Sequence, residues 1–156
     1  MHSIARARRG AAGLILAAAM TLVHSHAWAG GPQIAQVKTV SGDAVIVRDG
    51  ARLAAKVGDP VFEKDTIETG ADGSMGLTFT DNTVMSTGPD SEIALDEYRF
   101  DSSNFNGAML ADMRKGTVAM VSGDIARSTP GAMKIRTSSA ILGVRGTRFA
   151  IQVKGD

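Results

Sequence analysis

Apolar and polar residues alternate in short stretches along this chain, and turns that contain glycine separate the stretches. Alternation with a period of two places every second side chain on the same face, which is typical of β-strands. It is clearest in residues 74–80 and 148–154, whose apolar positions are Met75, Leu77, Phe79, Phe149, Ile151 and Val153. Weaker alternation predicts further strands at residues 37–40, 44–48, 83–86, 93–95, 116–121 and 133–137.

Turns built from glycine with Asp, Asn or Pro recur about every ten residues, and glycine makes up 18 of the 156 residues. Only residues 108–114 have a helix-forming composition, and this segment is too short to form a helix on propensity alone. The sequence therefore predicts an all-β fold, with a single compact domain of many short strands and Gly-rich turns that is either sandwich-like or a β-solenoid. Because aromatic residues are few, we expect an aliphatic core in which methionine fills space.

The N-terminal residues have the three parts of an export signal. Three arginines precede an apolar run at residues 11–23, and Ala27-Trp28-Ala29 offers small residues for cleavage. The run is shorter than the roughly 20 residues that a membrane-spanning helix needs. We therefore predict a periplasmic or secreted product with no stable membrane anchor after cleavage. The predicted segments are a signal peptide at 1–29, a short N-terminal lead at 30–36 and a β domain at 37–153.

Histidine and cysteine are absent after the predicted signal peptide, because the 3 histidines are His2, His24 and His26 and the chain has no cysteine. This composition excludes Ser-His-Asp and Cys-His catalysis, imidazole or thiolate zinc sites, thiol redox chemistry and disulfides. Residues 101–112 are rich in Asp and Asn but lack the ligand register of a calcium loop. We therefore expect a non-enzymatic protein that binds no cofactor and no metal.

Carboxylates are the remaining candidates for acid–base catalysis. Glu92, Asp96 and Glu97 lie close together in the sequence. In a strand, Glu92 and Asp96 would share a face while Glu97 points away. A hydrolase would need two carboxylates held at a defined separation in a groove. The alternative is a solvated acidic surface, and the sequence favours this alternative.

Charge is divided unevenly along the chain. Residues 30–106 contain 6 basic and 13 acidic residues, whereas residues 107–156 contain 8 basic and 3 acidic residues. Either the two halves pair within the fold, or their charged faces recruit a partner or stack protomers in a homo-oligomer. The net charge of −2 over residues 30–156 does not favour nucleic-acid binding. The residues that we expect to face a partner are Arg136, Arg148, Glu92 and Asp96.

An arginine enclosed by glycines occurs near the C-terminus, in the string Gly143-Val144-Arg145-Gly146-Thr147. Glycine adopts positive φ or admits a close backbone, so we expect Arg145 on a tightly constrained bend. Its guanidinium could hold carbonyl or carboxylate groups of neighbouring segments as a structural latch, or it could bind an anion of a partner. The sequence favours the latch, and a latch predicts that Arg145 is buried.

Five motifs occur together in an order that resembles a known family. They are Val57–Val61 with Asp65–Gly70, Gly76–Thr83, Gly116-Thr117, Ile135–Thr137 and Gly143–Thr147. Their order and spacing resemble the FecR domain family over residues 37–153. That family usually has Asp-Gly-Thr in the turn where this chain has Asp81-Asn82-Thr83. Asparagine tolerates left-handed turn geometry almost as well as glycine, so the same turn is expected here.

The resemblance implies a periplasmic, all-β, non-enzymatic domain. The namesake members of the family span the membrane, receive a signal from an outer-membrane transporter and control a sigma factor through a cytoplasmic anti-sigma segment. This chain resembles the stand-alone exported branch, which lacks the anti-sigma segment and the C-terminal signalling domain. We therefore do not carry iron-citrate sensing over to it.

Three functions fit these observations. The first is an interaction module in envelope signalling or assembly, which binds an envelope protein or polymer. The second is a structural envelope protein that self-assembles through its sheet edges. The third, with the least support, is a carboxylate-dependent hydrolase.

Overall fold

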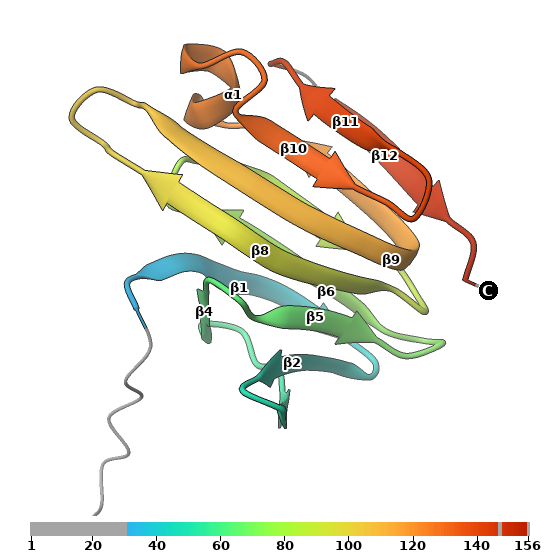
Figure 1. The fold of residues 1–156 in the computed structure, drawn as a ribbon. Helices are drawn as coiled ribbons and strands as arrows, with labels where there is room; N and C mark the ends of the chain where they lie inside the picture. The colour runs from blue at the N-terminus through green and yellow to red at the C-terminus, as the bar shows by residue number, and fades with distance from the viewer. Residues whose placement is uncertain (1–30, 147, 156) are drawn as a thin grey trace, which may run out of the picture.

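The computed structural model describes residues 31–146 and 148–155, and these residues fold almost entirely into β-strands (Figure 1). The all-β prediction is confirmed. The elements are β1 Gln33–Ser41, β2 Ala44–Arg48, β3 Ala51–Ala54, β4 Pro60–Phe62, β5 Thr66–Thr69, β6 Ser74–Phe79, β7 Val84–Thr87, β8 Glu92–Phe100, β9 Gly107–Val121, α1 Asp124–Ser128, β10 Met133–Arg136, β11 Ile141–Val144 and β12 Arg148–Val153.

The strands form one continuous curled sheet whose two halves face each other. The strand order is β4-β1-β6-β7-β9-β12 in one half and β3-β2-β5-β8-β9-β10-β11 in the other. Among the described residues, the ladder between β9 and β10 is parallel and the other ladders are antiparallel. A β-solenoid stacks parallel strands, so the sandwich-like architecture is the one that forms.

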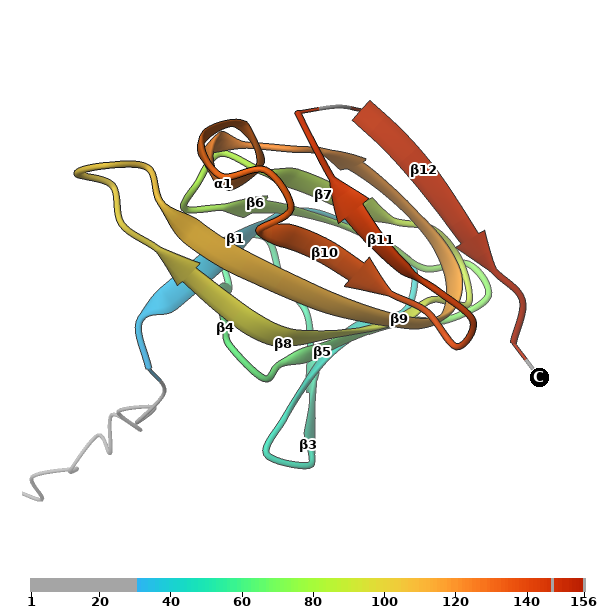
Figure 2. The same cartoon turned by 45° about the horizontal axis from the view of Figure 1, so that its top comes forward.

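Strand β9 belongs to both halves of the sheet and bends from one layer to the other (Figure 2). Its first part pairs with β8 and β10, and its last part, from Gly116 to Val121, pairs with β12. The bend falls at Gly116, where φ is +94° and an added Cβ would lie 2.3 Å from the Cα of Ser91. Only glycine can therefore occupy this position without moving the backbone.

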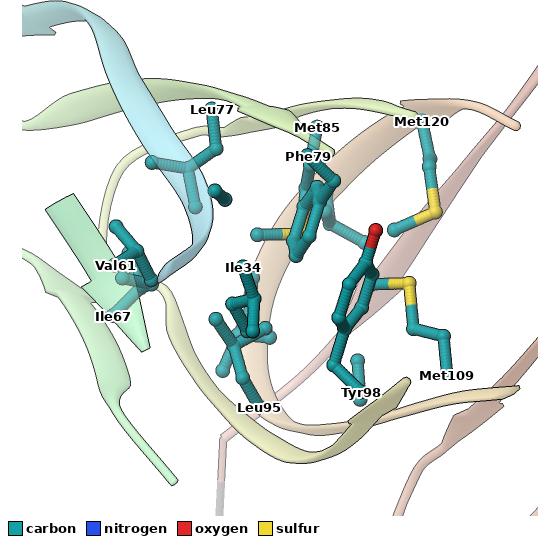
Figure 3. Close-up of a cluster of buried hydrophobic side chains, with 14 of the residues drawn as sticks. Ile34, Val61, Ile67, Leu77, Phe79, Met85, Leu95, Tyr98, Met109 and Met120 are labelled. Carbon is teal, nitrogen blue, oxygen red and sulfur yellow. The ribbon is translucent and has the colours of Figure 1, made fainter. Parts of the chain in front are cut away.

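The core lies between the two layers and consists of inward-facing aliphatic and methionine side chains, as predicted (Figure 3). Phe79 and Tyr98 stack near its centre, with ring centroids 5.4 Å apart. All the methionines of the described residues are buried, and they are Met75, Met85, Met109, Met113, Met120 and Met133. Unbranched methionine side chains fill the irregular space left where few aromatic rings are available.

The predicted strands form, and the structure adds four strands that the pattern did not predict, namely β3, β4, β5 and β11. Residues 108–114, which have a helix-forming composition, lie in β9 because their alternate side chains pack into the core. Strand β1 begins at Gln33 rather than at Val37, since Ile34 and Ala35 are buried. This part of the predicted N-terminal lead therefore belongs to the sheet.

The predicted signal peptide, residues 1–29, lies outside the described residues. Within residues 31–146 and 148–155, no helix is long and apolar enough to cross a membrane.

Candidate interaction surface

The predicted turn at Asp81-Asn82-Thr83 connects β6 to β7, and Asn82 adopts the expected left-handed conformation, with φ +64°. The side chains on either side of it point into the protein, because Asp81 and Thr83 are both fully buried. The Asp81 carboxylate accepts hydrogen bonds from the Thr83 amide at 3.1 Å and from the Thr83 hydroxyl at 2.8 Å. The turn is therefore fixed by its own buried side chains.

The same buried carboxylate connects the turn to β8 and to α1. The Tyr98 hydroxyl donates to Oδ1 of Asp81 at 3.1 Å, and the amide of Ile125 donates to Oδ2 at 3.4 Å. Two further backbone groups are held here, since the Asp124 amide donates to the Asp81 carbonyl and the Gly123 amide donates to the Thr83 hydroxyl. Burial raises the pKa of Tyr98 above its ordinary value, so the phenol stays protonated as a donor. The buried side chains of Asp81 and Thr83 hold the fold together and are not accessible to a ligand, whereas Asn82 between them is exposed.

Arg48, at the end of β2, and Asp65, in the loop before β5, form a buried ion pair. The Arg48 guanidinium donates to both carboxylate oxygens of Asp65, at 2.8 and 2.6 Å, and also to the Pro60 carbonyl at 3.0 Å. It lies over the Phe62 ring at 4.4 Å. Only 1% of the Asp65 side chain is exposed. Sequence analysis missed this pair, because Arg48 ends β2 and Asp65 lies in the loop before β5, and the sequence pattern does not show that these two places become neighbours.

Three of the four residues predicted to face a partner are paired with other residues of the sheet. Arg136 contacts Asp96 and also donates to Asp112 at 3.1 Å, and Arg114 donates to Glu92 at 2.6 Å. The hydrogen bond to Asp112, together with the charges of Asp112 and Asp96, raises the pKa of Arg136. The pairs Arg136–Asp96 and Arg114–Glu92 join basic residues of the C-terminal half to acids of the N-terminal half. The prediction that the halves pair within the fold is therefore supported on this face.

Two of the three carboxylates considered for catalysis, Asp96 and Glu97, line an open depression of about 610 Å³, together with Glu63, Lys64, Arg99 and Leu110, and Glu92 is not among its lining residues. Asp96 is the extra residue of a β-bulge between Leu95 and Glu97. The bulge changes the alternation, so Asp96 and Glu97 line the same depression, and the prediction that Glu97 points away is wrong. Asp96 contacts Arg136, and Glu97 pairs with Arg99 at 2.5 Å. Each of these two carboxylates is thus neutralised by an arginine.

Arg145 lies at the surface, just after β11, and makes no ion pair or side-chain hydrogen bond with the described residues. The structure therefore shows no latch at this position, and the anion-binding interpretation stays a prediction. Gly146 has the expected positive φ of +51°, but Gly143 lies within β11 with open space where its Cβ would be. Thr147 lies outside the described residues. Arg148 begins β12 and is exposed.

A cavity of about 310 Å³ lies between β11 and β12, which run side by side without pairing with each other (Figure 2). We call it the β11–β12 slot, and it is lined by Leu142, Gly143, Val144, Arg145, Phe149, Ala150 and Ile151. Leu142 pairs with buried Ile135, and Phe149 pairs with buried Met120, so both side chains point toward the core. Leu142 nevertheless remains 42% exposed. The sandwich is thus open at this end, a feature that sequence alternation alone could not reveal.

Fold and surface together define an all-β domain with open sheet edges and charged faces. In the part of the chain that the structure describes, no three His, Cys, Asp or Glu residues lie close enough to hold a metal ion.

Residues 65–156 match the family described as FecR protein, which is more than half of the chain, so the chain belongs to the FecR family. This confirms the resemblance that the motifs indicated. The family is one of signalling and regulation associated with the cell envelope. No curated protein and no solved structure matched the chain. The β11–β12 slot and the Asp81 turn both lie in the matched part.

Proposed function

We propose that this protein is a non-enzymatic FecR-family interaction module that works in the periplasm or outside the cell and binds an envelope protein in signalling or assembly. The observation that carries this proposal is the open end of the sandwich. At the β11–β12 slot, strands β11 and β12 leave apolar side chains and backbone edges uncovered. The chain belongs to a family of envelope signalling proteins, in which such a surface suits a binding role. Uncovered edges and apolar patches are features that proteins use for binding.

Export is supported by the three-part pattern of residues 1–29, with cleavage proposed before Gly30. A non-enzymatic role is supported by the lack of histidine and cysteine after residue 29. It is also supported by the arginines that engage Asp96 and Glu97, because a paired carboxylate is poorly placed to act as a general base.

The test begins with the full sequence produced in a bacterial host and separated into cytoplasmic, periplasmic and secreted fractions. We expect the protein in an extracytoplasmic fraction, with an intact mass that corresponds to a chain beginning at Gly30. Retention in the cytoplasm, or a chain that keeps its N-terminal arginines, would overturn the proposed compartment.

The binding role is tested in the same cells with a photo-crosslinking amino acid. Placed at Arg145 beside the β11–β12 slot, it should capture a discrete envelope protein. Val57 is the control position, because it is 66% exposed and lies in the loop between β3 and β4, away from the slot. Equal capture from both positions would show that the slot is not the binding surface.

A further inference from the structure

The β11–β12 slot has an apolar floor that continues the core of the protein. Val144 lies opposite Met133 on β10, and Ile151 lies opposite Val118 on β9, so their side chains point inward. Val144 is buried, whereas Ile151 is only partly buried. The slot therefore exposes side chains that a further strand would cover, and an uncovered edge strand of this kind can pair with another strand.

The backbone of β11 also has an uncovered edge. β11 pairs with β10 alone among the described residues, and the Thr137 amide donates to the Ala140 carbonyl at 2.8 Å where the two strands are joined. Hydrogen-bonded pairs alternate along an antiparallel ladder. Leu142 and Val144 are therefore bonded to β10, and Ile141 and Gly143 present their amide and carbonyl groups to the open edge.

Positive charge surrounds this edge. From Ile125 to Gly155 the sequence contains 6 basic residues and no acidic residue. Arg127 is paired with Asp124, and Arg136 is paired with Asp96 and Asp112. Lys134, Arg145 and Lys154 are exposed near the free strands. A segment that lies along β11 would therefore gain from carrying negative charge.

A second copy of the chain is a poorer occupant than an acidic segment. Pairing β11 with the β11 of another copy would bring two equally basic edges together, which is unfavourable. The free edge strand β3 contains no acidic residue, and its Arg52 is already paired with Glu68. Neither of these edges of a second copy supplies the missing negative charge.

We infer that the β11–β12 slot binds an extended acidic segment of a partner protein, which adds to the free edge of β11 as a strand. Alternate apolar side chains of the segment would fill the slot beside Leu142 and Phe149, and its acidic side chains would face the basic surface near Arg145. Strand addition of this kind takes affinity from backbone hydrogen bonds and specificity from the alternate side chains. This inference rests on the proposed function and adds the chemistry of the partner to it.

The test measures binding of synthetic peptides to the purified protein by fluorescence anisotropy. The first peptide has about eight residues and alternates valine with glutamate, enough to cover a short strand. The second has lysine in place of glutamate, and the third is the acidic peptide with alternate amides methylated. We expect the acidic peptide to bind about tenfold more tightly than either of the other two.

Substitutions at Gly143 test the backbone contact. Gly143→Pro removes an amide that points away from β10, and proline is tolerated on such an edge, so binding should weaken about fivefold or more. Gly143→Ala keeps the amide and places its Cβ in open space, so it is the matched control and should bind within about twofold of the parent protein.

Arg145→Glu is the second variant, and it tests charge without altering the strand. The affinity for the acidic peptide should fall about fivefold, and the affinity for the lysine peptide should rise. Equal affinities for the acidic and lysine peptides, or full binding by Gly143→Pro, would overturn the inference. Self-association that Gly143→Pro abolishes would also overturn it, because the occupant would then be a second copy. Cytoplasmic retention tests the proposed function separately, since the purified protein can bind the peptide in either case.

Discussion

The Tyr98 hydroxyl lies 3.1 Å from Oδ1 of Asp81 and 2.9 Å from the backbone nitrogen of the same residue, so one phenol both donates to Asp81 and accepts from it. Asp81 begins the turn between β6 and β7, and Tyr98 comes from β8, in the opposite layer. The pair therefore joins the two halves of the sheet through a polar contact inside an otherwise apolar core.

The first prediction concerns the titration of Tyr98. It is the only tyrosine of the chain, so absorbance of the phenolate near 295 nm reports this residue alone. Because burial raises its pKa, we expect the folded protein to titrate well above the ordinary tyrosine value of about 10. In strong denaturant the transition should return to about 10. A folded protein that titrates at the ordinary value would contradict the burial of this hydroxyl.

The same shift predicts how stability depends on pH. A group whose pKa is raised on folding stabilises the folded state below its unfolded pKa, and this contribution is lost as the pH rises toward the folded pKa. The free energy of unfolding should therefore fall above about pH 10, more steeply in the parent protein than in Tyr98→Phe. Urea denaturation at several alkaline pH values measures this difference.

Asp81→Asn should destabilise the protein by about 2–3 kcal/mol, measured by urea denaturation at neutral pH. The new amide group donates where the Thr83 hydroxyl now donates to Oδ2, so a buried donor loses its acceptor. Asp101→Asn is the control. Asp101 is an exposed carboxylate that accepts from the Ser103 amide at 2.9 Å, so its replacement should destabilise the protein much less than that of Asp81. Similar losses of unfolding free energy for the two variants would show that the hydrogen bonds of Asp81 do not stabilise the fold more than those of an exposed carboxylate.

Gly123→Ala should destabilise the protein by about 2 kcal/mol or more. An added Cβ would lie 2.0 Å from the Asp81 carbonyl oxygen and 2.4 Å from the Thr83 nitrogen, so the backbone would have to move. Gly143→Ala meets nothing within 4 Å and should leave the unfolding midpoint almost unchanged. If both alanine variants unfolded at the same denaturant concentration, the close packing around Gly123 would be disproved.

Arg48→Ala should lower the free energy of unfolding, measured by urea denaturation, by about 3 kcal/mol, because it leaves the buried Asp65 carboxylate without its counter-charge. Arg48→Lys should recover only part of this loss, since lysine lacks the planar fork that contacts both carboxylate oxygens. Arg52→Ala is the matched control, because the Arg52–Glu68 pair is exposed and should contribute less than about 1 kcal/mol. Equal losses at Arg48 and Arg52 would contradict the difference in burial.

Arg145→Ala should leave the free energy of unfolding within about 0.5 kcal/mol of the parent protein. The reason is that Arg145 is exposed and holds no other group among the described residues. A loss of about 2 kcal/mol or more, as expected for a buried charge-assisted hydrogen bond, would restore the latch interpretation. The measurement is chemical denaturation of the two proteins side by side.

Alternation predicted the fold well where strands have one buried and one solvated face. Strand β6 is an example, since Met75, Leu77 and Phe79 are all buried as the pattern required. The unpredicted strands are short, and three of them, β3, β4 and β11, lack a clear alternation of buried and exposed residues. β3 is mostly exposed, and β4 has only Val61 buried. Such strands are specified by the neighbours with which they pair, and a single sequence does not show those neighbours.

The side-chain pairs at the surface were harder to predict, because their residues are distant in the sequence and become neighbours only when the sheet curls. The glycines around Arg145 suggested a constrained bend, yet the arginine that is held inside the protein is Arg48. Its partner, Asp65, lies 17 positions away in the sequence. Glu92 and Asp96 are partly exposed carboxylates, and their arginine partners come from β9 and β10. Sequence spacing predicts which residues share a strand face, but it does not predict which strands become neighbours.

The pairing of β9 with several strands limits which insertions and deletions the gene can accept. Four strands, β7, β8, β10 and β12, take their register from this one segment. Inserting or deleting one codon within it would reverse the facing of the side chains beyond that point and misalign several ladders at once. The loop from Asp101 to Asn106 is exposed and can absorb such changes. Length variation should therefore be tolerated at this loop and eliminated from the strand that follows it.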